Sequence, residues 1–171
     1  ARFHAEVYEQ ASVHVHAREA GLDPARFAPI LTIGDVDRLV TTTDLRQDDL
    51  VLADAAVEGG IPHSDYVDSG GFIDRGAVAR KHREGATIIL NQAHRFLSGL
   101  GELCQAIEGE FSCHVQTNLY LTPAGAQGFP THFDSHDVFV LQVAGQKQWQ
   151  LYGTPLANPY RGERFQRHSH E

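Results

Sequence analysis

Two residues constrain this chain more than any others, a histidine and an aspartate two positions apart, His132 and Asp134. In an extended strand alternate side chains point to the same side, so an imidazole and a carboxylate would share one face here. With a second histidine, such a pair forms the two-histidine, one-carboxylate arrangement that holds Fe(II). His136 cannot complete the set from the same strand, because four residues of strand span roughly 13 Å. The third ligand must come from elsewhere, and the alternative is that the pair is ordinary surface polarity.

The residues that follow the pair have the pattern of two β-strands. Val138–Val143 is apolar and rich in β-branched and aromatic residues, which predicts a buried strand. Ala144–Gln146 is a turn signal. Lys147–Tyr152 then alternates, so that Lys147 shares a face with Trp149. A lysine is seldom fully buried unless it is paired, and the pattern suggests the carboxylate of a bound anion as its partner.

The residues that precede the pair predict a strand and a loop. Cys113–Thr122 alternates, which places Asn118 and Tyr120 on one side of a strand. By themselves, these two side chains would indicate a solvated strand face. Pro123–Pro130 contains two prolines and two glycines, which predicts an irregular loop. We place this loop at the rim of the metal site.

These segments together resemble a known family of oxygenases. The 37 residues from Gln116 to Tyr152, QTNLYLTPAGAQGFPTHFDSHDVFVLQVAGQKQWQLY, are similar to the core motif of the cupin-like JmjC oxygenases. Within that family they most resemble the ribosomal-oxygenase branch, which hydroxylates ribosomal proteins. The resemblance implies a double-stranded β-helix (jelly-roll, or cupin) fold, Fe(II) as the metal and 2-oxoglutarate as the cosubstrate.

The same resemblance implies a role for five residues. His132 and Asp134 match the iron ligands, and Lys147, thirteen residues beyond Asp134, matches the partner of the distal 2-oxoglutarate carboxylate. Asn118 and Tyr120 match positions that line the cosubstrate pocket. No general acid or base is required, and we nominate none. The implied substrate is a protein side chain, with a histidine or arginine of a ribosomal protein as the leading expectation.

The third ligand is where this chain departs from the family. Relatives carry their second histidine well downstream, near a Gly-Asp-x-x-Tyr-x-Pro segment that this sequence does not contain. Beyond the motif, only His168 and His170 remain, and a charged terminus is more often frayed than recruited. We therefore expect the chain to be a fragment of a longer polypeptide, and the absence of any methionine fits that expectation.

The fold class that follows is mainly β with N-terminal helices (α+β), a double-stranded β-helix truncated in its C-terminal half. At 171 residues the chain suits a single domain, 1–171. We expect a mixed, helical part over 1–112 and the first strands of the β-helix over 113–171. The spacing of apolar residues and the turn signals predict helices at 3–10, from 32 or 35 to 40, at 75–84 and at 93–108, and strands at 12–16, 50–53 and 86–90.

The net charge and the cysteine content limit the classes of partner and the compartment that we expect. The net charge of −8 argues against direct nucleic-acid binding, which needs clustered lysine and arginine, but would attract a basic protein. Two cysteines are too few for a disulfide scaffold. No signal peptide or membrane-spanning run is visible. We expect a cytoplasmic protein with a protein substrate and no membrane partner. Whether the protein forms a homodimer is left open.

Two other classes of function remain to be weighed. The same fold can serve as a metal-binding cupin with isomerase or sensor duties, or as a catalytically inactive relative that binds protein in its groove. A purely structural interaction domain would bind no metal. The spacing of Asn118 and Lys147 around His132 favours the oxygenase, whereas loss of the third ligand would favour the inactive binding module.

Overall fold

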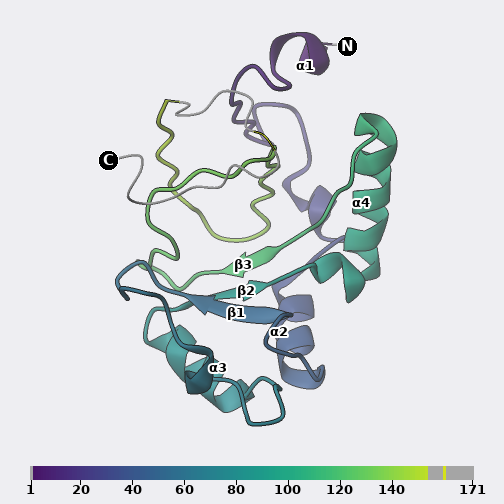
Figure 1. Ribbon diagram of the computed structural model, residues 1–171. Helices are drawn as coiled ribbons and strands as arrows, with labels where there is room; N and C mark the ends of the chain where they lie inside the picture. The colour runs from purple at the N-terminus through teal and green to yellow at the C-terminus, as the bar shows by residue number, and fades with distance from the viewer. Residues whose placement is uncertain (1, 154–159, 161–171) are drawn as a thin grey trace. The chain divides into compact units, whose positions relative to one another are not determined.

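The computed structural model describes residues 2–153 and 160. The chain divides into two compact units (Figure 1). We call Pro29–Thr131 the sheet unit, and Ala1–Ala28 with His132–Glu171 the terminal unit. Each unit is described by itself.

The sheet unit is built on a three-stranded antiparallel sheet, in the order β1-β2-β3 (Figure 1). Its strands are β1 (Leu50–Ala53), β2 (Thr87–Leu90) and β3 (Leu119–Leu121). In the register, Leu50 and Leu119 both lie opposite Leu90. The first two strands confirm the predicted ones, and β3 is the central part of the strand predicted over 113–122.

One face of this sheet carries the hydrophobic core. Because side chains alternate along a strand, every second residue of each strand faces the core, where helices cover it. The core comprises Leu50, Leu52, Ile88 and Leu90 of the sheet, with Leu119 and Leu121 packed against it, and Val36, Leu39, Ala77, Val78 and Leu100 of the helices. Helices α2 and α3 lie on the same side of the sheet (Figure 1).

Local sequence signals explain where helix α2 (Ile33–Thr42) begins. The Thr32 hydroxyl accepts a hydrogen bond from Asp35 N at 3.2 Å, and the Asp35 carboxylate accepts one from Thr32 N at 2.9 Å. This reciprocal pair is a capping box, which satisfies two backbone donors that the first turn leaves unpaired. The hydrogen bonds from Thr32 hold the pKa of Asp35 below its usual value. Of the two predicted N-caps, Thr32 and Asp35, Thr32 is the one that the structure shows.

The two later helices confirm the predictions with one change. Helix α3 spans Arg75–Arg83, and Asp74 caps it by accepting a hydrogen bond from Ala77 N at 3.0 Å. Helix α4 spans Ser98–Phe111, later than the predicted start at Ala93. The preceding residues, Ala93–Arg95, form a separate 3-10 turn, η3. Further 3-10 turns lie at Pro24–Phe27 (η1) and His63–Asp65 (η2).

The terminal unit contains less regular structure than the sequence predicts. Helix α1 spans only Arg2–Glu6, and the predicted strand Ser12–His16 is exposed and irregular. The predicted strands Val138–Val143 and Lys147–Tyr152 are also irregular and exposed, with Phe139 53% and Leu151 70% exposed. These strand predictions are wrong for the structure described here. An apolar run becomes a strand only where a neighbour accepts its backbone hydrogen bonds, and among the described residues no such ladder is formed there.

The fold class is therefore confirmed only in its coarse form. The described chain has a small antiparallel sheet with a few helices, and the jelly-roll and the single domain over 1–171 stay predictions. None of its helices combines the length and the apolar character needed to cross a bilayer.

Helix α4 approaches the chain before α2 closely at Gly99. A methyl group built on Gly99 would lie 2.8 Å from the carbonyl oxygen of Ile30 and 3.0 Å from its Cα. Backbone atoms cannot move aside as a flexible side chain can. Gly109, in the same helix, has open space at the equivalent point.

We predict opposite effects of alanine at these two glycines. Gly99→Ala should lower the free energy of unfolding by about 1–3 kcal/mol, because the added methyl group overpacks the contact with Ile30. Gly109→Ala should raise it by up to about 1 kcal/mol, since alanine favours the helix more than glycine does. Urea titration followed by circular dichroism measures both. Equal effects of the two substitutions would contradict the close approach.

A buried tyrosine covers the outer edge of strand β1. Leu52 N on edge strand β1 donates a hydrogen bond to the Tyr66 hydroxyl at 3.4 Å, and Tyr66 is 1% exposed. An unpaired N–H group on an edge strand can pair with another chain. Here the phenol oxygen of Tyr66 accepts the hydrogen bond of Leu52 N. Burial raises the pKa of Tyr66 above its ordinary value.

Tyr66→Phe should destabilise the sheet unit by about 1–3 kcal/mol at neutral pH, because Leu52 N is left buried without an acceptor. The difference between wild type and variant should narrow above about pH 10, the ordinary tyrosine pKa. In that range the folded chain keeps a phenol proton that the unfolded chain has lost, so the stability of the wild type falls as pH rises. Urea titrations at pH 7 and above pH 10 test both parts, and a constant difference would contradict the second.

Candidate functional site

Asn118 and Tyr120 lie on the side of the sheet opposite the core. Tyr120 pairs with Ile89 in the register and is 50% exposed. Asn118, partly buried, directly precedes β3, and its Oδ1 accepts a hydrogen bond from Gln92 N at 3.0 Å. The register places Tyr120 on the second face, and the predicted alternation assigns Asn118 to the same face. The contact of Asn118 with Gln92 was not predicted, because nothing in the sequence pattern links the two positions.

The loop Pro123–Pro130 returns over this second face. Gln127 O accepts a hydrogen bond from Ala55 N at 2.9 Å. A methyl group added to Gly128 would lie 2.8 Å from Thr87 Oγ1, so only glycine allows the loop to come this close to β2. The Phe129 ring meets the Tyr120 ring edge-on, with centroids 6.1 Å apart. The predicted irregular loop is confirmed as an irregular segment that lies against Tyr120.

The predicted metal ligands belong to the terminal unit. His132 and Asp134 are both exposed and lie in irregular backbone, with Phe133 partly buried between them. Lys147 is also exposed, and its Nζ lies 5.8 Å from the centroid of the Trp149 ring. That distance falls within the range of a cation–π interaction. The predicted proximity of Lys147 and Trp149 is thus present, although not on a strand.

The five predicted residues fall into two sets, one in each unit. Asn118 and Tyr120 share the sheet unit, whereas His132, Asp134 and Lys147 share the terminal unit. Within residues 2–153 and 160, no group of three or more His, Cys, Asp or Glu side chains is gathered to hold a metal. His168 and His170, the remaining candidates for a third ligand, lie outside the described residues.

The chemistry of these side chains fits the implied groups. An imidazole and a carboxylate are two of the three ligands of the non-haem Fe(II) site. A lysine ammonium is a suitable partner for a carboxylate. An asparagine amide and a tyrosine hydroxyl can each donate a hydrogen bond to oxygen. The donor set thus suits Fe(II) and a keto diacid, with the third ligand still to be supplied.

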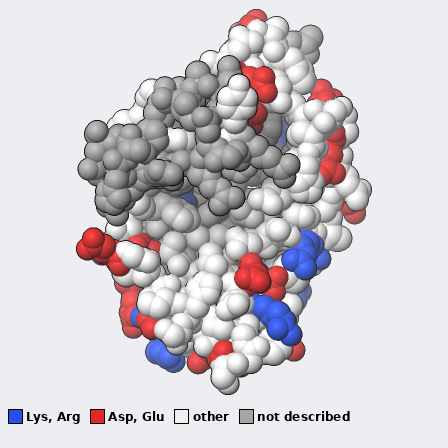
Figure 2. Space-filling view, viewed as in Figure 1, with Lys and Arg blue, Asp and Glu red and all other residues white. Residues whose placement is uncertain are grey.

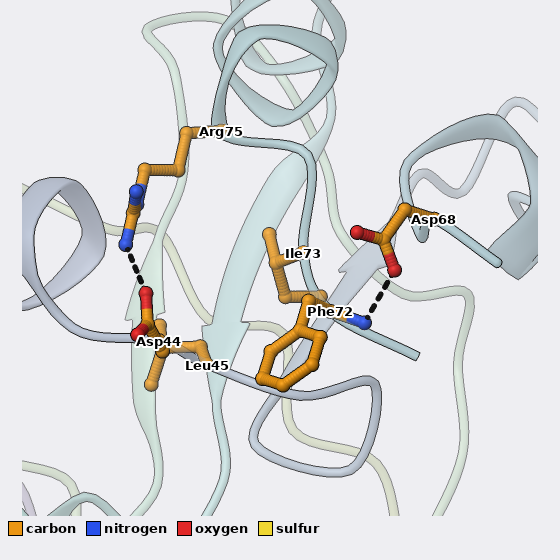
Figure 3. Close-up of a pocket in the computed structure, with 6 residues that line it drawn as sticks. All are labelled: Asp44, Leu45, Asp68, Phe72, Ile73 and Arg75. Carbon is orange, nitrogen blue, oxygen red and sulfur yellow. Dashed lines mark hydrogen bonds and ion pairs between the residues drawn. The ribbon is translucent and has the colours of Figure 1, made fainter. Parts of the chain in front are cut away.

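The sheet unit also has a hollow, and none of the five predicted site residues lines it. It has a volume of about 320 Å³ and is lined by Asp44, Leu45, Asp68, Phe72, Ile73 and Arg75 (Figure 3). Arg75 pairs with Asp44 at 2.9 Å, and Asp68 Oδ1 accepts from Gly70 N and Phe72 N. These contacts tie the lining groups to one another, so we regard the hollow as structural.

Charges on the surface are mixed. On the face shown in Figure 2, acidic and basic side chains are interspersed over the described residues. The basic residues of α3 are partly neutralised in this way, since Lys81 Nζ lies 2.9 Å from the Asp65 carboxylate. The hydrogen bond and the charge of Asp65 raise the pKa of Lys81.

Comparison with known proteins agrees with the resemblance seen in the motif. Residues 90–170 match the family described as JmjC domain. The bifunctional lysine-specific demethylase and histidyl-hydroxylase NO66 of Dictyostelium discoideum is 44% identical over 81 residues, 47% of this chain and 16% of the relative. Ribosomal oxygenase 2 of Bos taurus is 44% identical over 91 residues, 50% of this chain and 20% of the relative.

The matched region includes all five predicted site residues. The chain spans only about a fifth or less of the length of these relatives. Proteins with a JmjC domain generally use Fe(II) and 2-oxoglutarate, and the two relatives are named for oxygenase or hydroxylase activities. Residues 90–170 are therefore a JmjC-domain segment, and the resemblance of this chain to the ribosomal oxygenases is confirmed.

Proposed function

We propose that this protein is an oxygenase that uses Fe(II) and 2-oxoglutarate to hydroxylate a side chain of another protein. The observation that carries the proposal is the presence of His132, Asp134 and Lys147 at the family spacing inside the JmjC-domain segment. Isolated His-x-Asp pairs are common, but a lysine thirteen residues further on adds a group that a keto diacid needs and a structural metal does not.

Each residue would contribute one kind of contact. His132 and Asp134 would hold the metal, and Lys147 would bind the distal carboxylate of the cosubstrate through a charge-assisted hydrogen bond. Asn118 and Tyr120 would donate hydrogen bonds from the second face of the sheet. Bound iron and cosubstrate together supply the oxidising chemistry, while the protein orients them and excludes water.

The contact between the rings of Phe129 and Tyr120 suits the exclusion of water from the site. The centroids of the two rings lie 6.1 Å apart, and Gly128 brings the loop against β2. Apolar surface at the edge of a reaction site keeps water from the reacting groups. We propose that the loop Pro123–Pro130 forms this part of the rim.

The proposed substrate is a basic protein. The net charge of −8 would attract lysine-rich and arginine-rich chains such as those of ribosomal proteins. The relatives support this class by name, since one is a histidyl-hydroxylase and the other a ribosomal oxygenase. We propose a histidine or arginine side chain of a ribosomal protein as the target, with the cytoplasm as the compartment.

An anaerobic titration tests the proposal directly. Fe(II) is added to the protein in the presence of 2-oxoglutarate, and the weak visible charge-transfer band of the ternary complex is followed. Growth of the band supports the oxygenase. Binding of metal without a change on adding 2-oxoglutarate would favour a metal-binding cupin of another function. Binding of neither would favour an interaction module.

We predict that His132→Ala abolishes Fe(II) binding, because it removes one of the two ligands present in the described chain. His136→Ala is the matched control, since this exposed histidine lies four residues further on and is not a ligand in our assignment. Isothermal titration calorimetry under nitrogen measures the affinity of each variant for the metal. Equal losses in the two variants would contradict the assignment of His132.

Lys147→Ala should leave Fe(II) binding intact and weaken 2-oxoglutarate binding. Removing one charge-assisted contact costs about 1.5–3 kcal/mol, which raises Kd about tenfold to a hundredfold. Gln148→Ala, at the exposed neighbouring position, should change neither affinity. Titration of 2-oxoglutarate into the metal-loaded variants measures the effect. A Lys147→Ala variant that loses the metal as well would show that the lysine does not act on the cosubstrate alone.

A further inference from the structure

The turn between β2 and α4 has an unusual backbone at Gln92. This residue has φ 48° and ψ 42°, in the left-handed region. Residues other than glycine seldom adopt this conformation, and where they do, the surrounding contacts hold it in place. The next residue, Ala93, is completely buried and begins the 3-10 turn η3. The conformation of Gln92 aims two successive N–H groups at the segment that leads into β3.

Three hydrogen bonds join this turn to Thr117 and Asn118. Gln92 N donates to Asn118 Oδ1 at 3.0 Å, and Ala93 N donates to Thr117 O at 2.7 Å. In the opposite direction, Thr117 N donates to His94 Nδ1 at 3.2 Å. The Thr117 hydroxyl is held separately by Cys104 of α4, at 3.0 Å from its Sγ. Both the backbone and the side chain of Thr117 are therefore fixed.

These contacts determine which way the Asn118 amide faces. A backbone N–H can pair only with an acceptor, so the atom nearest Gln92 N must be the amide oxygen and not the amide nitrogen. The two N–H groups of Asn118 are consequently directed away from the turn. Within the described part of the chain, no acceptor pairs with them. The Asn118 amide is thus oriented with its oxygen toward the turn and its N–H groups as donors, two residues before Tyr120.

His94 acts in this arrangement as an acceptor. Because Nδ1 receives the Thr117 N–H, it carries no proton, and the neutral ring carries its proton on Nε2. The imidazole therefore supports the backbone directly before Asn118. An acceptor at the position of Nδ1 is what this role requires, and the asparagine side chain could present one at a similar distance from the backbone.

We propose that the turn Gln92–His94 is a positioning element that holds Asn118 as a donor to an oxygen of bound 2-oxoglutarate, with His94 as its positioning residue. The inference rests on the proposed function and adds residues that the JmjC motif around His132 does not contain. It also predicts that this turn affects the affinity for 2-oxoglutarate, through one of its carboxyl or keto oxygens, and not the affinity for the metal.

A pair of substitutions at His94 tests the positioning role. His94→Leu removes the acceptor and should raise the Kd for 2-oxoglutarate about tenfold, the lower end of the effect of losing such a supporting contact. His94→Asn restores an acceptor and should bind 2-oxoglutarate like the wild type. Fe(II) affinity should not change in either variant. Calorimetric titration of each ligand, with thermal unfolding as a check on folding, separates this effect from a general loss of structure.

Asn118→Asp separates orientation from donation. The aspartate can still accept from Gln92 N but has no N–H group to donate, so 2-oxoglutarate affinity should fall at least tenfold. Amide hydrogen exchange at Gln92 should stay as slow as in the wild type. A normal Kd for 2-oxoglutarate in both His94→Leu and Asn118→Asp would overturn the inference and leave the proposed function standing. Absence of 2-oxoglutarate binding by the unsubstituted protein would overturn both.

Discussion

The burial of strand β2 on both of its faces is the constraint on which the rest of the sheet unit depends. Its four residues, Thr87 to Leu90, are each no more than 5% exposed. Ile88 and Leu90 pack into the helix-covered core, and Thr87 and Ile89 lie on the opposite face. A strand buried in this way must have its backbone groups paired on both sides, which β1 and β3 provide. Strand β2 therefore contributes to the core on one face and to the face that carries Tyr120 on the other.

Residues at the two ends of β2 link the stability of the sheet unit to the arrangement of segments on its second face. Thr87 is a buried polar residue whose hydroxyl pairs with Thr122 at 3.0 Å, just beyond the end of β3. The same hydroxyl sets how closely Gly128 can approach. At the other end of β2, the chain enters the left-handed turn at Gln92 that contacts Asn118. Both ends of β2 thus place segments that the proposed cosubstrate site would use.

Much of the sheet unit could be predicted because its signals are local. Thr32 and Asp35 carry their capping box within one turn, and Leu50–Ala53 is bounded by polar residues that mark its ends. Val138–Val143 has an equally strong apolar signal, yet its residues are exposed and irregular. The difference is that a helix satisfies its own backbone, whereas a strand depends on partners distant in the sequence. The roles of the five site residues stay predictions that rest on the resemblance of their motif to the JmjC oxygenases. The contact of Gln92 with Asn118 depends on how two distant segments meet, which no periodicity in the sequence indicates.

The two roles that we propose for Asn118, as acceptor from Gln92 N and as donor to the cosubstrate, explain why an amide suits this position. A carboxylate could accept from Gln92 N but could not donate to a second oxygen, and it would repel a dicarboxylate. A serine could both accept and donate but is one atom shorter, so it would not span from the turn to a ligand beyond the sheet. A leucine would remove the acceptor that Gln92 N has in Asn118. Asparagine alone among these residues meets both demands, and it meets them only because a neighbouring turn has fixed its oxygen. The geometry of the β2–α4 connection, rather than the identity of residue 118 by itself, makes this side chain a donor.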